Sequence, residues 1–138
     1  MSMFKIFDIS GSAVSAQSQR LNTVASNLAN VDTVAGPDGK SYKAHQVTFQ
    51  SVLMNTADGL PAAGVKVSGV SEDQTPGRRV HDPANPSADA EGYVTYSNVN
   101  AVDEMVNMIS ASRSYQNNIE VMNTAKTLLL KTPQLGQG

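Results

Sequence analysis

The chain has 138 residues, of which 16% are charged and 5% aromatic, and its formal net charge is −2. This balance lacks the basic surface that binds nucleic acid, and the only basic doublet, Arg78-Arg79, is typical of a solvated loop. Because the chain has no cysteine, disulfides, thiolate metal sites and a cysteine nucleophile are excluded. We expect no membrane span, which needs about 18 consecutive apolar residues, and no cleaved secretory signal, because residues 1–10 contain no continuous apolar stretch.

Residues 4–31 are predicted to form a helix, since they contain no proline and carry an apolar row at every seventh position. Such a row lies along one side of a helix and is typical of packing against a second helix. The polar positions are mostly Ser, Thr, Asn and Gln, which are weaker helix formers than Glu and Lys. We therefore expect this helix to be weakly stable alone and to become ordered when its apolar row is covered. The row consists of Phe7, Val14, Leu21 and Leu28.

Residues 34–98 have a different composition and hold five of the six prolines and seven of the ten glycines. The Gly-Pro-Asp-Gly sequence at residues 36–39 is a strong turn signal. Few large apolar residues are available in this segment, so we expect a small, loop-rich β unit. Its short strand-like pieces lie at Val47 and Phe49, at Val65 and Val67, and at Tyr93–Tyr96.

A second long helix is predicted over residues 99–131. Asn100 is a suitable capping residue, and Asp103 and Glu104 place acidic side chains in the first turn, where they favour the helix dipole. Thr132-Pro133 is expected to end the helix. A helix of about thirty residues spans roughly 45 Å, which is long for so small a chain and predicts contacts with neighbouring molecules. Its apolar row again recurs at every seventh position and consists of Met108, Tyr115, Met122 and Leu129.

These segments predict an α+β fold, in which the N- and C-terminal helices pair as an antiparallel coiled coil. The paired helices would come from residues 1–33 and 99–138, with the small β domain of residues 34–98 inserted between them. We expect the terminal helices to carry an assembly interface, because apolar rows of this kind need a partner to cover them. The candidate residues are Phe7, Val14, Leu21, Ala25, Asn27, Leu28 and Asn30 on the first helix, and Met108, Ala111, Tyr115, Ile119, Met122 and Leu129 on the second.

No catalytic motif is complete in this sequence. The Gly-Lys-Ser at residues 39–41 resembles the end of a phosphate-binding loop, but Val34 stands where that motif needs its first glycine. Residues 87–92 have the early spacing of a calcium loop, but the last ligand position falls on Asn98 in place of glutamate. His45 and His81 each lack a second histidine at metal-ligand spacing. We therefore predict no enzymatic activity, no cofactor and no metal site.

Several segments resemble a known family. Residues 25–33, Ala-Ser-Asn-Leu-Ala-Asn-Val-Asp-Thr, resemble the signature near the N-terminus of bacterial flagellar rod and hook proteins. In most axial proteins of this group an aromatic–basic pair follows the signature directly, whereas here residues 36–39 separate it from Tyr42-Lys43. This insertion favours a flagellar basal-body rod protein over the longer hook and distal-rod proteins. Further segments similar to that rod family lie at residues 6–13, 81–94, 98–100, 104–106, 110–116 and 131–136.

The resemblance implies a structural subunit of the bacterial flagellar proximal rod, which self-assembles through its terminal helices, encloses the export channel and transmits torque. The implied partners are copies of the chain, other proximal rod subunits, the adaptor that joins the rod to the MS ring, the distal rod and the flagellar type III export apparatus. The implied location is the rod in the periplasmic space, reached without a cleaved signal peptide. The alternatives are a cytoplasmic coiled-coil adaptor or binding module, and another flagellar axial protein.

Overall fold

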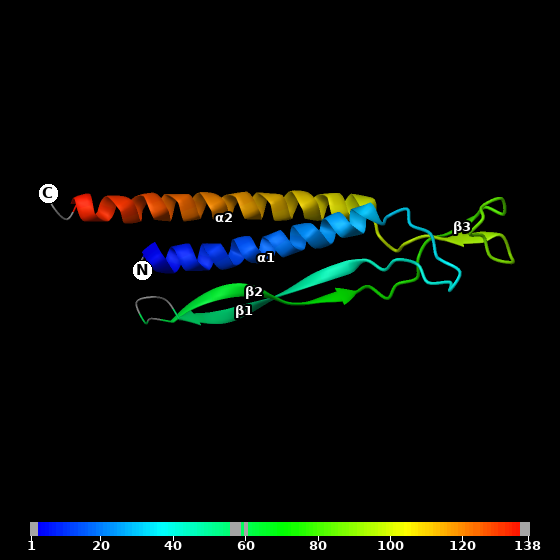
Figure 1. Ribbon diagram of the computed structural model, residues 1–138, viewed down its shortest axis with the longest axis horizontal. Coiled ribbons are helices and arrows are strands. Elements are labelled where there is room, and N and C mark those ends of the chain that lie inside the picture. Colours follow the sequence, from blue (N-terminus) through cyan, green and yellow to red (C-terminus); the bar gives the residue numbers. More distant parts are fainter. Residues whose placement is uncertain (1–2, 56–58, 60, 136–138) are drawn as a thin grey trace.

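The computed structural model describes residues 3–55, 59 and 61–135, and the chain forms an elongated molecule of three layers (Figure 1). Helix α1 is the middle layer, with helix α2 along one side and the hairpin of β1 and β2 along the other. The short strands β3 and β4 form a separate small sheet at one end of the molecule. The elements in chain order are α1 (Met3–Ala29), β1 (His45–Asn55), β2 (Pro61–Glu72), β3 (Arg79–His81), β4 (Tyr93–Thr95) and α2 (Ala101–Leu135).

The two helices run antiparallel and side by side, so the ends of the chain lie close together (Figure 1). This arrangement confirms the predicted α+β class and the pairing of the terminal helices. The helices differ in length, with 27 residues in α1 and 35 in α2. At about 1.5 Å per residue, α2 is roughly 12 Å longer. Its C-terminal end continues past the beginning of α1 (Figure 1).

The start of α2 agrees with the sequence, but its end does not. The Asn100 side-chain oxygen accepts hydrogen bonds from the backbone nitrogens of Val102 and Asp103, at 3.0 and 3.2 Å, which confirms Asn100 as the helix cap. The predicted end at Thr132-Pro133 is wrong, because α2 continues through both residues to Leu135. A proline removes the hydrogen bond of its own nitrogen and strains the preceding turn, but it leaves the residues after it free to stay helical.

Strands β1 and β2 form one long antiparallel hairpin, paired from His45 with Glu72 to Asn55 with Pro61. The sequence predicted only short pieces within these strands. The hairpin lies close to α1 at Gly64, where an added Cβ would come within 2.9 Å of the Ser12 hydroxyl oxygen. That hydroxyl accepts a hydrogen bond of 3.1 Å from the backbone nitrogen of Val65. A residue without a side chain therefore lets strand β2 dock directly on the helix.

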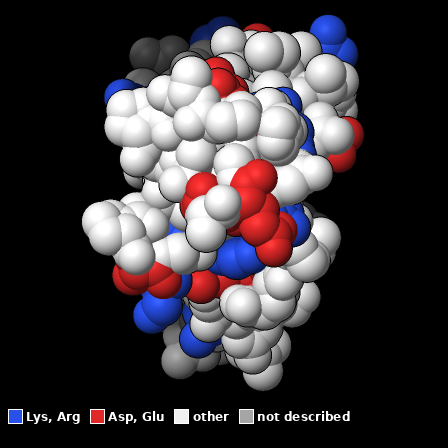
Figure 2. Space-filling view, turned by 90° about the vertical axis from the view of Figure 1, so that its right-hand side faces the viewer, with Lys and Arg blue, Asp and Glu red and all other residues white. Residues whose placement is uncertain are grey.

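The small sheet of β3 and β4 pairs Arg79 with Thr95 and His81 with Tyr93, and it buries Val94 completely. Figure 2 looks at the end of the molecule that carries this sheet, where basic and acidic side chains are interleaved. A surface of mixed sign does not attract a polyanion as a basic patch does.

The buried apolar residues are mostly alanines, together with two valines. A core of small side chains buries little apolar area per residue, so the single chain gains modest stability from packing. The division into residues 1–33, 34–98 and 99–138 remains a prediction, although the hairpin from the middle segment packs along α1. The buried apolar residues are Ala16, Val24, Ala44, Ala62, Val94, Ala111 and Ala125.

Candidate functional site: the paired terminal helices

Small residues lie where α1 and α2 face each other. Ala111 and Ala125 of α2 are buried, and a Cβ built on Gly11 of α1 would lie 3.8 Å from the terminal methyl carbon of Met122. Alanine and glycine let two helix backbones approach closely, and the longer side chains then fill the remaining space. Arg20 adds a polar contact between the helices, because its Nη2 atom donates to the side-chain oxygen of Asn107 at 3.1 Å.

Most of the candidate assembly residues are half-buried in the single chain. Met108 remains 37% exposed, Ala25 is exposed and Asn30 is half-buried, whereas Asn27 and Ala111 are fully inside. The apolar rows are thus partly covered within the single chain, in which α1 packs on both α2 and the hairpin. Whether they also contact neighbouring subunits remains a prediction. The half-buried apolar members are Phe7, Val14, Leu21, Leu28, Tyr115, Ile119, Met122 and Leu129.

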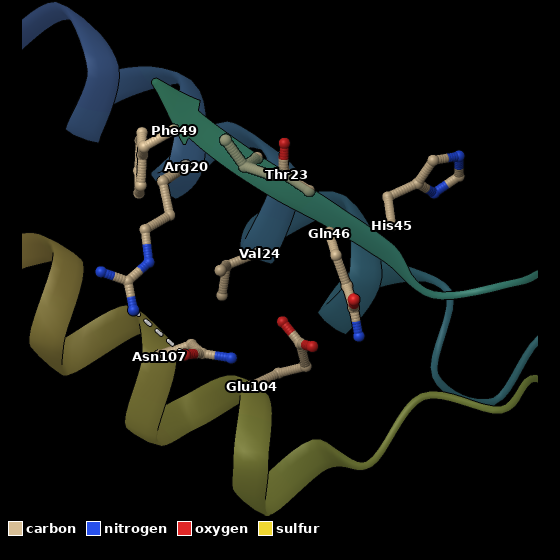
Figure 3. Close-up of a pocket in the computed structure, with 9 residues that line it drawn as sticks. Arg20, Thr23, Val24, His45, Gln46, Phe49, Glu104 and Asn107 are labelled. Carbon is tan, nitrogen blue, oxygen red and sulfur yellow. Dashed lines mark hydrogen bonds between the residues drawn. The ribbon is translucent and has the colours of Figure 1, made fainter. Parts of the chain in front are cut away.

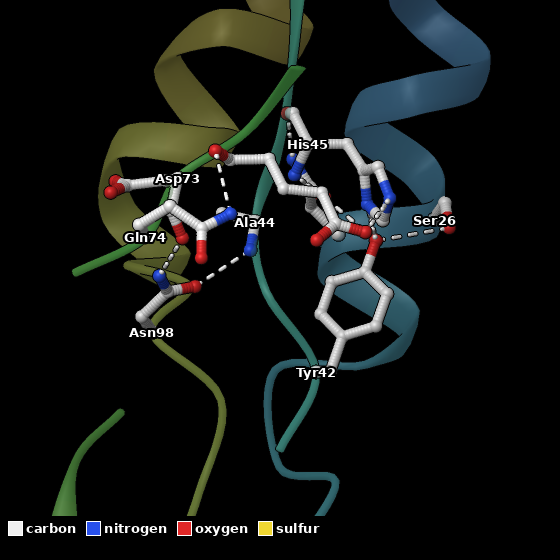
Figure 4. Close-up of polar contacts among 9 residues, drawn as sticks. Ser26, Tyr42, Ala44, His45, Asp73, Gln74 and Asn98 are labelled. Atoms are coloured by element: carbon white, nitrogen blue, oxygen red, sulfur yellow. Dashed lines mark hydrogen bonds and ion pairs between the residues drawn. The ribbon is translucent and has the colours of Figure 1, made fainter. Parts of the chain in front are cut away.

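Asn27 joins α1 to the start of the hairpin. Its side-chain nitrogen donates to the carbonyl oxygen of His45 at 2.8 Å, and its side-chain oxygen accepts from the backbone nitrogen of His45 at 2.9 Å. The same oxygen accepts a third bond, of 2.8 Å, from the Tyr42 hydroxyl. Tyr42 also contacts His45 and Ser26, as Figure 4 shows. The amide is only 1% exposed, so these bonds replace water that it cannot reach.

Asn98 makes a second junction, between the segment before α2 and both ends of the hairpin (Figure 4). Its oxygen accepts from the backbone nitrogen of Ala44 at 2.6 Å, and its nitrogen donates to the carbonyl oxygens of Asp73 and Thr75 at 2.7 and 2.8 Å. Sequence reasoning missed the structural role of both asparagines. An asparagine that closes long-range backbone contacts has no local signal, since its partners are far away in sequence.

The outward side of α2 carries a row of exposed apolar side chains that sequence reasoning also missed. Val102, Met105, Val106 and Ile109 are between 54% and 68% exposed. Their spacing of three, four and seven places them on one side of the helix, and this spacing was the available signal. They lie on the opposite side from the buried Ala111. We call these four residues the outer apolar face. Such a surface is typical of a protein contact.

A groove of about 500 Å³ lies where the beginning of α1 meets the second half of α2. Met3 and Ile6 line it from α1, and Val121, Ala125 and Leu128 line it from α2. Most of the side chains that line the groove are apolar. The groove and the outer apolar face both lie on the paired helices, which makes these helices the main candidate for contacts with other molecules.

The residues considered for catalysis or metal binding have structural roles. The Asp89 carboxylate accepts hydrogen bonds from the backbone nitrogens of Tyr93 and Glu91 and pairs with Arg79 at 3.2 Å. The Tyr93 N–H in particular holds the pKa of Asp89 below its usual value. His81 packs edge-on against the Tyr93 ring.

Within residues 3–55, 59 and 61–135, no group of three or more His, Cys, Asp or Glu side chains could hold a metal ion. In the same part of the chain, no helix has the length and apolar character needed to cross a membrane.

In the comparison with known proteins, family models of flagellar rod proteins match both ends of the chain. Residues 7–37 match the family model of the flagella basal body rod protein, and residues 90–135 match that of the flagellar basal body rod FlgEFG protein C-terminal region. The flagellar basal-body rod proteins FlgC of Escherichia coli O157:H7 and Salmonella typhimurium are each 58% identical to the chain, over 99% of its length and 100% of theirs.

The FlgC protein of Buchnera aphidicola subsp. Schizaphis graminum is 46% identical, again over 99% of the chain and all of the relative. Similarity that extends from end to end, at both family models and through the middle segment, leaves the cytoplasmic adaptor without support. The chain therefore belongs to the flagellar basal-body rod protein family, as a FlgC-type structural subunit of the rod and not an enzyme.

Proposed function

We propose that this subunit builds the proximal rod by packing α1 and α2 against the same helices of neighbouring subunits, so that the assembled shaft encloses an export channel and transmits torque. Its neighbours in this proposal are copies of itself, the other proximal rod subunits, the adaptor to the MS ring and the distal rod. The subunit reaches the periplasmic part of the rod through the flagellar type III export apparatus, without a cleaved signal peptide.

The observation that carries the proposal is the outer apolar face of α2. Four large apolar side chains are 54–68% exposed there, on the side of α2 opposite the buried Ala111. Burying a side chain of this size completely is worth about 1.5–3 kcal/mol, so covering the exposed part of all four is worth roughly 4–7 kcal/mol before the cost of association. A neighbouring subunit that covers this face gains a substantial part of its binding energy there.

The composition of the helices supports assembly as the event that completes them. The core between and around them consists of small side chains, and α1 has many Ser, Asn and Gln residues. Pairing of the apolar rows as a coiled coil therefore leaves each subunit with limited stability of its own, which contacts from neighbours increase. Polar amide and hydroxyl groups also suit a crowded interface, since they form hydrogen bonds without burying net charge.

The contact surfaces differ from each other, which favours an open assembly. The outer apolar face lies on one side of α2, and the groove of Met3 and Leu128 lies between the two helices. Contacts between unlike surfaces repeat from copy to copy and generate a helical filament when the rotation does not close. A shaft built around a channel is a filament of this kind.

The test replaces Ile109 by aspartate in cells that lack the native subunit. The change places a charge on the outer apolar face without entering the core, so the purified chain should keep its helical circular-dichroism signal while swimming and recovery of rods are lost. The matched control is Gln116→Asp, which lies one seven-residue step further along the same side of α2 and is exposed. Normal swimming with Ile109→Asp would show that this face is not an assembly surface.

A second variant examines the apolar row of α1. Leu28→Asp introduces a charge at a half-buried position of the α1 apolar row. We expect loss of incorporation into the rod, because an unpaired charge in the helix contact costs several kcal/mol. The measurement is co-purification of the variant with basal bodies. Incorporation at the normal level would refute the role of this row.

A further inference from the structure

A pocket of about 420 Å³ lies between α1, β1 and α2 (Figure 3). Its walls combine apolar groups, such as Val24 and Phe49, with the carboxylate of Glu104, which points from the first turn of α2 into the space. Gln46 at its edge is exposed, so the pocket opens to the surface. The remaining lining residues are Arg20, Thr23, His45, Val47 and Asn107.

Glu104 is a buried acid with an unused hydrogen-bonding atom. Its side chain belongs to a residue only 9% exposed, and its Oε2 atom has no hydrogen-bond partner within the described residues. The positive end of the α2 dipole offsets part of the cost of this buried charge. The rest remains, because a carboxylate removed from water needs a cation or several donors to compensate.

The cation nearest at hand within the chain is directed elsewhere. The Arg20 guanidinium also lines the pocket, but one terminal nitrogen donates to Asn107 at 3.1 Å (Figure 3), and the other donates to Gln17 at 3.5 Å. Arg20 therefore fixes the wall of the pocket and ties α1 to α2. Within the described residues the Glu104 carboxylate therefore has no ion pair, and its Oε2 atom is both unpartnered and shielded from solvent.

The chain itself carries a cation suited to this pocket. Arg113 is exposed on α2, and it has neither an ion pair nor a hydrogen bond from its side chain within the part of the chain that the structure describes. It lies four residues after Ile109 and seven after Val106, so it extends the outer apolar face by a positive charge. An apolar face next to a guanidinium matches a pocket with apolar walls next to a carboxylate.

We propose that Arg113 of one subunit enters the Glu104 pocket of the next copy, while the outer apolar face covers the rim of that pocket. Arg113 and Glu104 lie on different sides of α2, so the pair cannot form within one chain and instead joins successive copies in the same direction. A guanidinium suits this role because its planar donors fit a carboxylate and it is less strongly hydrated than an ammonium group. The inference rests on the proposed function, since it specifies one contact of the assembly described there.

The first experiment is a double-mutant cycle in cells that lack the native subunit, with full-length chains and recovery of complete rods as the measurement. Glu104→Gln and Arg113→Gln should each reduce rod recovery by roughly tenfold or more, because each leaves a buried partner unpaired. The double variant should yield at least as many rods as the more impaired of the two single variants, because the two residues act as a pair. The control is Lys126→Gln, which removes another exposed basic residue of α2 and should leave recovery unchanged.

A second measurement separates pairing between copies from a role within the fold. In the isolated chain Glu104 is unpaired, so Glu104→Gln should leave the thermal midpoint unchanged or raised, while it lowers rod recovery. If Glu104 were needed only for folding, its replacement would lower both the thermal midpoint and rod recovery. The cycle is overturned by normal recovery with either single variant, or by a double variant whose loss is the product of the two single losses.

The third measurement identifies the occupant directly. A photo-reactive amino acid at Gln46, at the edge of the pocket, should cross-link in assembled rods to the segment of a second copy that contains Arg113. Cross-linking to another segment or to another rod protein would refute the assignment of the occupant. Rods that assemble normally with all of these variants would refute only this contact, whereas failure of the unaltered chain to restore rods would refute the proposed function itself.

Discussion

Replacing Asn27 by alanine should release the start of the hairpin from α1. The change removes three hydrogen bonds and leaves both backbone groups of His45 without the partner they have in the native chain. A typical hydrogen bond contributes about 1 kcal/mol, and a buried group left unpaired costs about 1–3 kcal/mol. Because His45 is half-buried and water can satisfy part of the loss, we expect the free energy of unfolding to fall by about 2–4 kcal/mol.

The assay is amide hydrogen exchange of the full chain, combined with urea unfolding followed by circular dichroism. A loss of 2–4 kcal/mol should make the His45 amide exchange roughly 30- to 700-fold faster. Asn30→Ala is the matched control, because this half-buried side chain makes only local, water-accessible bonds: its nitrogen donates to the Ser26 carbonyl and its oxygen accepts from the Thr33 hydroxyl. That change should cost about 0.5 kcal/mol or less.

Two results would refute this reasoning. The first is an Asn27→Ala chain as stable as the Asn30→Ala control, which would mean that the three bonds add nothing beyond those made with water. The second is a His45 amide that already exchanges freely in the unaltered chain. In that case α1 and the hairpin would not be docked in the isolated subunit.

Other regions give further predictions. Gly77→Ala should destabilise the small sheet by about 1–3 kcal/mol in thermal unfolding, because the added Cβ would collide with the backbone oxygen of Tyr96. The control is Gly69→Ala, which should be nearly neutral because its added Cβ would meet no atom within 4 Å. Equal effects of the two changes would contradict the role of close packing at residue 77. The pKa of Asp89 is lowered by the Tyr93 N–H, so its charged form stabilises the loop at any pH above the ordinary aspartate value, and this contribution should disappear as the pH falls through the lowered pKa. In NMR, the Tyr93 amide shift should titrate below the ordinary aspartate range near 4, and Asp89→Asn should abolish that titration; a midpoint at the ordinary value would show that the bond is not formed in solution.

The sequence was informative where the signal is local or periodic. The apolar rows beginning at Phe7 and Met108 predicted two long helices, and Asn100 was correctly identified as the cap of α2. The family resemblance, carried by segments near both ends, agreed with the comparisons with known proteins. Helix periodicity and capping are properties of neighbouring residues, which is why they can be read without the fold.

The remaining features depend on contacts between distant residues. Strand β2 contains Ala62, Ala63, Gly64 and Gly69, so its alternation is hidden, and only the pairing with β1 makes it a long strand. The outer apolar face was overlooked because the row of Met108 was taken as the apolar side of α2, although the helix carries apolar residues on two sides.

The unequal lengths of α1 and α2 have a mechanical consequence. Since α2 is roughly 12 Å longer than α1 and continues past its start, the paired helices do not end in a flat plane. In the proposed assembly, copies stacked end to end would overlap, so that each junction between copies would be spanned by the α2 helix of an adjoining copy. Such a shaft would have no cross-section at which every helix ends, and twisting stress would be carried along continuous backbone hydrogen bonds and not across a single weak plane.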